Sequence, residues 1–417
     1  MSDIVVYNCQ TEYGEDMKKK IGCLGLFCAL LVTGGSISAY KIKEIPVVSA
    51  FESVQSGEFI GEDLKIEAKS AYLSNFSTNT AIYAKAEHER LPIASMCKIM
   101  TLLVTFEGIK AGILDFNEKI TVSEKAASMG GSQVFLEANA QYCVHELIKS
   151  IVVCSANDSC VALAERIAGS EALFVERMNR RAEELGMEDT LFANCTGLPK
   201  QPQYSCAKDV AIMLSELLKH EEYYQFSNVW MDKFQHPEGR YTEISNTNKL
   251  VRFYEGCDGG KTGFTNEAGF CLAATAKRNG MRIISVVIGA ENSQKRFGGV
   301  REMFDYAFAN YENKVVYKAG EALPKSACVD GGKEKILPLT PAEDVTSFTK
   351  RGEKSDINCR LEINKIKAPV KKGDCIGEIV VYEKGVEKKR ILLVAMKDIK
   401  KATLWDKIRD VARNWNG

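Results

Sequence analysis

Two apolar segments joined by Asn279-Gly280 constrain the fold of this chain more than any other feature. The segments cover residues 270–278 and 281–290. Asn-Gly between apolar runs is the strongest short signal for a tight β-hairpin, because both residues accept the positive φ that a type I′ turn requires. The two segments are therefore predicted to be antiparallel neighbours in a sheet.

Strand and helix patterns alternate in blocks before and after this hairpin. An earlier hairpin is predicted at residues 66–86, with its turn between Asn75 and Asn79. Helices are predicted at residues 95–109, 144–153, 161–168 and 300–311. The first helix is apolar around most of its circumference, which predicts a buried helix. Strands on both sides of a helical middle favour an α+β fold over repeated βαβ units.

The chain has 417 residues, and a soft prior of about 150 residues per domain suggests two or three domains. The pattern changes after Asn313. Short apolar runs at residues 336–339, 379–381 and 391–394 alternate there with turns that contain Gly and Pro. A small β-sandwich is therefore predicted at residues 313–398.

The N-terminal segment, residues 1–39, has the pattern of an export signal. Three lysines at residues 18–20 precede an apolar run at 21–32 and small residues at 34–39. The run is shorter than the roughly 20 apolar residues that span a membrane. Residues before Met17 carry acidic groups and no basic ones, so Met17 is an alternative start. An uncleaved anchor remains an alternative to a cleaved signal, and either predicts export.

The C-terminal segment, residues 399–417, is predicted to be an amphipathic helix. Its apolar residues recur at helical spacing: Leu404, Trp405, Ile408, Val411, Ala412 and Trp415. Trp at both ends of such a stripe is typical of a helix that lies in a membrane interface. An ordinary helix packed on its own domain is the alternative.

Charge and metal-ligand patterns exclude several classes of function. Lys+Arg and Asp+Glu are 55 each, so the basic excess of a typical nucleic-acid-binding protein is missing. The four His form no HExxH motif, and no two of the 14 Cys form CxxC, so common zinc sites are not expected. Several Cys lie in apolar stretches, which favours buried thiols over disulfides.

Ser95 and Lys98 form an S-x-x-K motif at the start of the buried helix. Residues three apart lie on one helical face, so the hydroxyl and the amine can meet. Burial disfavours the charged amine, and a neutral Lys98 could then deprotonate Ser95. The same spacing at Ser205 and Lys208 is expected to have no catalytic role.

Two further motifs are candidates for a site. Ser155 and Asn157 lie in the break between two predicted helices, although a simple turn with Asp158 as helix cap explains them better when this motif is taken alone. Residues 261–263 are Lys-Thr-Gly before a strand. An ammonium group beside a hydroxyl suits a carboxylate, and Gly263 would let a substrate backbone approach; a Gly-rich turn is the alternative.

In this order, the three motifs resemble those of the active-site serine penicillin-recognising enzymes. Segments 89–101, 130–136 and 246–265 resemble one family of them, the D-alanyl-D-alanine carboxypeptidases or low-molecular-mass penicillin-binding proteins. The resemblance implies a β-lactamase/transpeptidase-like catalytic domain at residues 60–312. The following sandwich and the amphipathic tail resemble the family's C-terminal domain and membrane anchor.

The resemblance also implies catalytic roles. Ser95 would attack the carbonyl between the two terminal D-alanines of a peptidoglycan stem pentapeptide, with Lys98 as general base. Ser155 would relay the proton to the departing D-alanine. Asn157 would hold Lys98 and the substrate amide. Water would then hydrolyse the acyl-enzyme, which would limit cross-linking during cell wall synthesis.

Substrate-binding roles follow from the same resemblance. Lys261, Thr262 and Gly263 would bind the terminal carboxylate, with Arg296 close to them. The backbone N–H groups of Ser95 and Phe264 would form the oxyanion hole. The resemblance implies no metal or organic cofactor, covalent inhibition by β-lactam antibiotics, and action at the outer face of the bacterial cytoplasmic membrane.

Three alternative functions remain open. A transpeptidase would use the same acylation with an amine acceptor. A class A β-lactamase would add a Glu for deacylation, but no E-x-x-L-N element occurs between Asn157 and Lys261. A silent wall-binding protein would not need the complete motifs. Two departures from the family are Cys97 in the first motif and Phe264, where some members have His.

Overall fold

The computed structural model describes residues 64–353, 357–383, 385–406 and 408. The predicted signal at residues 1–39 and most of the predicted helix at 399–417 lie outside the described residues. Within the described ranges, no helix has the length and apolarity needed to cross a membrane. Leu404 and Trp405 are 73% and 74% exposed.

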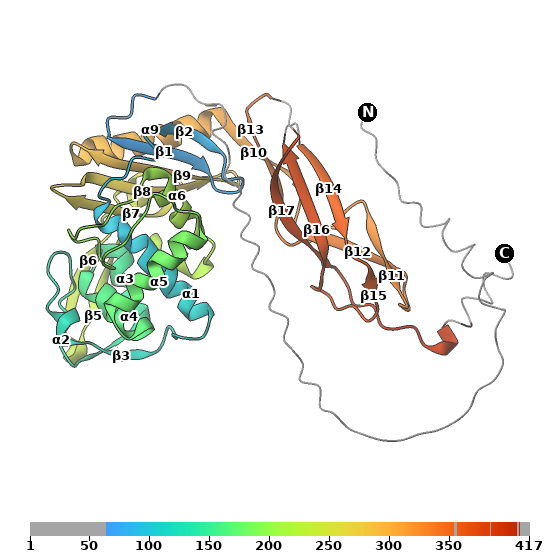
Figure 1. The fold of residues 1–417 in the computed structure, drawn as a ribbon, viewed down its shortest axis with the longest axis horizontal. Coiled ribbons are helices and arrows are strands. Elements are labelled where there is room, and N and C mark those ends of the chain that lie inside the picture. The colour runs from blue at the N-terminus through green and yellow to red at the C-terminus, as the bar shows by residue number, and fades with distance from the viewer. Residues whose placement is uncertain (1–63, 354–356, 384, 407, 409–417) are drawn as a thin grey trace, which may run out of the picture. The chain divides into compact units, whose positions relative to one another are not determined.

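A five-stranded antiparallel sheet forms the centre of the first region (Figure 1). Its order is β2 (Ala81–Lys85), β1 (Ser70–Asn75), β9 (Met281–Ala290), β8 (Gly269–Arg278) and β7 (Cys257–Thr265). Both predicted hairpins are confirmed, as β1–β2 and β8–β9. Asn279 and Gly280 have φ of 49° and 76°, as the tight turn between β8 and β9 requires.

Helices cover both faces of this sheet. Side chains of β8 alternate between the faces: Cys271 and Ala273 join one core, while Leu272 and Ala274 join the other. The first core contains residues of α1 (Lys98–Lys110), α3 (Val144–Cys154), α4 (Asn157–Ala168), α5 (Glu171–Glu184) and α6 (Ala207–Leu217). The second contains residues of α9 (Ser293–Asn310).

The helix predictions are confirmed with shifted ends. The predicted helix at 95–109 is the 3₁₀ turn η1 (Ala94–Cys97) followed by α1. The predicted helix at 300–311 was wrong at its start, because α9 begins at Ser293, where the Asn292 side chain accepts a hydrogen bond from Lys295 N. The shorter elements are α2 (Glu124–Ala127), η2 (Glu221–Tyr223), α7 (Tyr224–Ser227), η3 (Pro237–Gly239), α8 (Leu250–Phe253), β3 (Lys119–Thr121), β4 (Gln141–Cys143), β5 (Met231–Gln235) and β6 (Tyr241–Ser245).

The second region is rich in β-structure, as expected. A six-stranded sheet has the order β14 (Ile357–Ile363), β16 (Cys375–Glu383), β17 (Val386–Ala395), β12 (Ile336–Pro341), β11 (Ser326–Asp330) and β15 (Ile366–Lys367). A separate pair consists of β10 (Tyr311–Tyr317) and β13 (Val345–Lys350). The three apolar runs predicted as strands are parts of β12, β16 and β17, and they contribute to one core.

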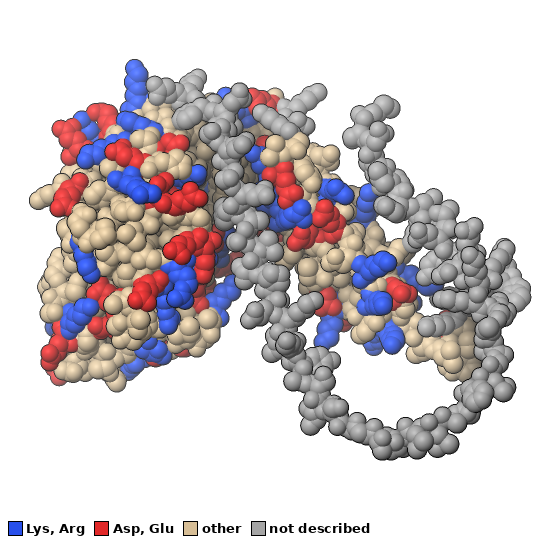
Figure 2. Space-filling model, viewed as in Figure 1, with Lys and Arg blue, Asp and Glu red and all other residues tan. Residues whose placement is uncertain are grey.

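Charged side chains of both signs intermingle on the face shown in Figure 2. Many of them pair locally. Arg390, for example, contacts Glu362, Glu378 and Glu387. The described part of this face is therefore a mixed surface rather than a field of one sign.

Candidate active site

Ser95 and Lys98 meet at the junction of η1 and α1. Lys98 Nζ lies 3.1 Å from Ser95 Oγ and donates a hydrogen bond of 2.5 Å to Thr196 O. The Lys98 side chain is fully buried. Burial lowers the pKa of Lys98 below its usual range, because the charged amine loses its water. The amine beside Ser95 therefore becomes neutral at a lower pH than the amine of an exposed lysine does.

The turn that presents Ser95 is strained and closely packed. Ala94 has φ of 48°, in the left-handed region that a side chain disfavours. Two glycines leave room for this turn: a Cβ on Gly197 would lie 2.0 Å from Ala94 O, and one on Gly263 would lie 2.7 Å from Ile93 O. The expectation that Gly263 makes space for substrate was wrong, because the space is taken by residues 93–95.

Ser155 and Asn157 lie between α3 and α4. Ser155 ends α3 with φ of 68°, and Asn157 begins α4. Ser155 Oγ and Asn157 Oδ1 are buried and have no hydrogen-bond partner among the described residues. A buried polar atom without a partner is costly, so both oxygens are available to a bound molecule.

The contact predicted between Asn157 and Lys98 is wrong in this structure. Asn157 Nδ2 instead donates to Gly130 O at 2.7 Å, and Asn157 N donates to Ser132 O at 2.7 Å. Asp158 is not a helix cap either, because it lies inside α4. Its carboxylate accepts hydrogen bonds from the backbone N–H groups of residues 134 and 136. Together, these contacts fix the segment that holds Asn157.

Lys261 and Thr262 lie on β7, the edge strand of the sheet. Lys261 is buried and its Nζ donates to Thr262 O at 3.2 Å. Burial and then the nearby charge of Lys98 lower the pKa of Lys261 to about 7. Thr262 Oγ1 donates to Thr247 Oγ1 at 2.8 Å. An amine and two hydroxyl groups therefore gather at this edge.

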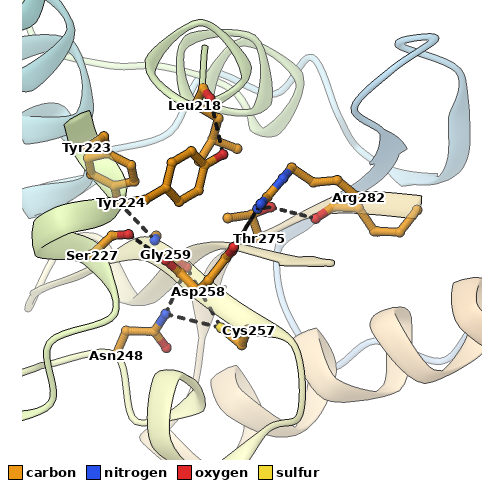
Figure 3. Close-up of polar contacts among 12 residues, drawn as sticks. Leu218, Tyr223, Tyr224, Ser227, Asn248, Cys257, Asp258, Gly259, Thr275 and Arg282 are labelled. Carbon is orange, nitrogen blue, oxygen red and sulfur yellow. Dashed lines mark hydrogen bonds and ion pairs between the residues drawn. The ribbon is translucent and has the colours of Figure 1, made fainter. Parts of the chain in front are cut away.

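Contacts at the beginning of β7 fix its position (Figure 3). Both carboxylate oxygens of Asp258 accept hydrogen bonds of 2.7 Å from the Arg282 guanidinium. Ser227 Oγ donates to Asp258 O at 2.5 Å, and Asn248 Nδ2 donates to Gly259 O at 3.2 Å. Side chains from three other segments thus hold the strand just before Lys261.

Arg296 and Phe264 lie close to the end of the Lys-Thr-Gly motif. Arg296 is buried, donates weakly to Gly263 O at 3.5 Å and Cys271 O at 3.4 Å, and leaves Nε without a partner among the described residues. Burial lowers the pKa of Arg296 to about 10. Phe264 is 52% exposed, and the centroid of its ring lies 4.5 Å from that of the Phe270 ring. Contact of Arg296 with a substrate carboxylate stays a prediction.

Some contacts of the site had no assigned role in the sequence. In the sequence, only its place in segment 246–265 marks Thr247, which lies between two Asn residues whose side chains form hydrogen bonds with the backbone. The carbonyls of Thr196 and Gly130 leave no sequence signal, because every residue has a carbonyl.

One other group has metal-ligand chemistry. Within the described ranges, ligand atoms of His88, Asp189 and Cys206 lie within 4.8 Å of one another. Arg90 Nε already donates to Asp189 Oδ1 at 3.0 Å, so the carboxylate has a cationic partner. The group includes no residue of the three motifs.

Comparison with known proteins identifies the family. Residues 57–292 match the family model described as D-alanyl-D-alanine carboxypeptidase. The chain belongs to this family. Its enzyme class is that of the serine-type D-Ala-D-Ala carboxypeptidases, as the family resemblance implied. Residues 311–401 match the model described as penicillin-binding protein 5, C-terminal domain.

Relatives match most of the chain. It is 41% identical over 369 residues to the D-alanyl-D-alanine carboxypeptidase DacF of Bacillus subtilis (strain 168), covering 88% of this chain and 94% of the relative. Penicillin binding protein 5 from Haemophilus influenzae has a TM-score of 0.64 at 29% identity, covering 82% and 99% of the two chains. PBP3 from Streptococcus pneumoniae has a TM-score of 0.69 at 27% identity, and the match covers 81% of this chain and 100% of that protein. The predicted transpeptidase-like fold is confirmed.

The lowered pKa of Lys261 leads to a prediction about proton uptake. A bound carboxylate favours the ammonium form of Lys261, so peptide binding at pH 8 is expected to take up about one proton. Calorimetry of the Ser95→Ala variant with a D-Ala-D-Ala peptide, in buffers of different ionisation enthalpy, measures this uptake. At pH 6 Lys261 is already charged, so uptake should nearly vanish. Equal uptake at both pH values would contradict the assignment.

Proposed function

We propose that this enzyme removes the terminal D-alanine from peptidoglycan stem pentapeptides through an acyl-enzyme on Ser95. The observation that carries the proposal is the buried Lys98 amine, 3.1 Å from Ser95 Oγ. Neutral Lys98 takes the hydroxyl proton as Oγ bonds to the carbonyl carbon between the two D-alanines. The backbone N–H groups of Ser95 and Phe264 stabilise the resulting oxyanion.

The remaining steps assign the other motifs. When the C–N bond breaks, the proton passes through Ser155 to the amine of the departing D-alanine. Asn157 holds the substrate amide through its free Oδ1. Water then adds to the acyl carbon, and its attack releases the shortened peptide and restores the Ser95 hydroxyl.

The carboxylate of the terminal D-alanine is assigned to the edge strand β7. Lys261 supplies a charge, while Thr262 supplies a hydroxyl that is already paired with Thr247. Gly263 lies on the same strand, and Arg296, whose Nη1 lies 3.5 Å from Gly263 O, adds positive charge nearby. The structure of the related penicillin-binding protein D2 from Listeria monocytogenes is known with ampicillin bound. That protein is 29% identical to this chain with a TM-score of 0.54, and the match covers 59% of this chain and 100% of that protein. We therefore propose that this enzyme also binds β-lactam antibiotics.

The same proposal places the enzyme outside the cytoplasm, where peptidoglycan lies. Support comes from the signal pattern at residues 1–39 and from the exposed Leu404 and Trp405, the first residues of the apolar stripe in the predicted amphipathic segment. The C-terminal helix would hold the enzyme at the outer face of the membrane, and its trimming of pentapeptides would limit cross-links and influence cell shape.

Release of D-alanine tests the proposed reaction. Wild-type protein is expected to release D-alanine from a stem pentapeptide, whereas Ser95→Ala should lose about 10⁴-fold or more of the rate, because the nucleophile is gone. Ser77→Ala, in the β1–β2 turn, is the control and should release D-alanine at the wild-type rate. Undiminished release by Ser95→Ala would reject the acyl-enzyme.

A further inference from the structure

The loop at residues 194–197 lies against the start of α1 through three successive carbonyl groups. Cys97 Sγ donates to the carbonyl of residue 194 at 3.2 Å, and Thr101 Oγ1 donates to that of residue 195 at 2.7 Å. Lys98 Nζ donates to Thr196 O at 2.5 Å. We call residues 194–197 the carbonyl loop; its third carbonyl is the acceptor for the amine beside Ser95.

The Asn194 side chain shapes this loop from within. It is 7% exposed, and its Oδ1 accepts hydrogen bonds from Gly197 N at 2.7 Å, Thr196 N at 3.1 Å and Thr196 Oγ1 at 3.2 Å. Its Nδ2 donates to Leu198 O at 2.8 Å. Both ends of the amide are therefore used, and they fix the direction of the peptide group that carries Thr196 O.

A lysine amine needs such a fixed acceptor to act as a base. Its four-carbon chain allows many positions for the nitrogen. A neutral amine has two N–H groups and one lone pair, so an N–H bonded to Thr196 O restricts where the lone pair of Lys98 points. Ser95 Oγ lies 3.1 Å away and can then share its proton with that lone pair.

We propose that Asn194 is a positioning residue, which acts through the Thr196 carbonyl to keep the Lys98 amine aimed at Ser95. The inference rests on the proposed function, in which Lys98 is the general base. A misplacement of about 1 Å can cost about 10²-fold in rate. Asn194→Ala is therefore expected to lower the rate constant of acylation by a fluorescent penicillin about 10²-fold. The rate constant is that of the protein molecules that are able to react.

The conservative variant Asn194→Asp separates positioning from folding. Its carboxylate can accept the same three hydrogen bonds, which also favour its ionised form, although the donation to Leu198 O is lost. Most of the acylation rate should return at alkaline pH. The acidic limb of the pH profile should shift to higher pH, because a nearby negative charge stabilises the Lys98 ammonium.

Asn179→Ala is the matched control. Asn179 Nδ2 donates to Phe192 O at 2.9 Å and its Oδ1 accepts from Phe192 N at 2.8 Å, so its side chain bonds the backbone two residues before the carbonyl loop. This variant should unfold at lower temperature yet acylate at the wild-type rate.

The outcomes distinguish this inference from the proposed function. If wild-type protein is not acylated, the proposed function fails. A different result overturns the inference. If wild-type protein is acylated, and both Asn194 variants have the same acylation rate constant and pH profile as wild type, then Asn194 has only a structural role.

Discussion

Replacement of Lys98 with methionine is expected to lower the rate of acylation by penicillin about 10⁴-fold, the upper range for loss of a general base. Methionine has a similar length and fills the same space, but it has no amine to accept the Ser95 proton. Since Lys98 is fully buried, an apolar side chain is expected to preserve or raise stability. Stopped-flow acylation together with thermal unfolding measures both effects.

Lys208→Met is the control for this experiment. Lys208 follows Ser205 at the same spacing in another part of the chain, and it should leave acylation unchanged. Acylation of folded Lys98→Met at the wild-type rate would show that another group deprotonates Ser95.

Replacement of Gly197 with alanine is expected to lower the free energy of unfolding by about 2–5 kcal/mol and to abolish most acylation. Gly197 has φ of 80°, and a Cβ there would lie 2.0 Å from Ala94 O. Ala94 immediately precedes Ser95, so the chain can relieve the clash only by moving the nucleophile or the carbonyl loop. Denaturant unfolding and acylation rates measure the two losses.

Gly112→Ala separates the clash from the backbone cost. Gly112 has φ of 71°, but a Cβ there would have no atom within 4 Å. Its replacement should cost only about 1–2 kcal/mol and leave acylation intact. Equal losses in the two variants would mean that the contact with Ala94 O contributes nothing.

The fold could be predicted where a local pattern determines structure. The Asn279-Gly280 hairpin is an example, since its turn chemistry and apolar strands agree. The sequence pattern does not predict the start of α9, because Gly298 and Gly299 interrupt the apolar pattern before Val300. Gly299 is small for a tertiary reason that the sequence does not show: a Cβ there would lie 3.1 Å from Ile66.

The candidate site could be predicted only in part, for a similar reason. The pairing of Ser95 and Lys98 follows from helical spacing, which is local. The space beside Gly263 and the partner of Asn157 depend on distant segments, so both expectations were wrong. The Thr196 carbonyl has no side-chain signature at all.

The acyl-enzyme can be tested most directly by mass analysis of intact protein after incubation with a labelled penicillin. Wild-type protein is expected to gain the mass of one penicilloyl group, and peptide mapping should locate it on Ser95. Ser95→Ala should gain none. Folded wild-type protein without an adduct, or an adduct that persists in Ser95→Ala, would contradict the account.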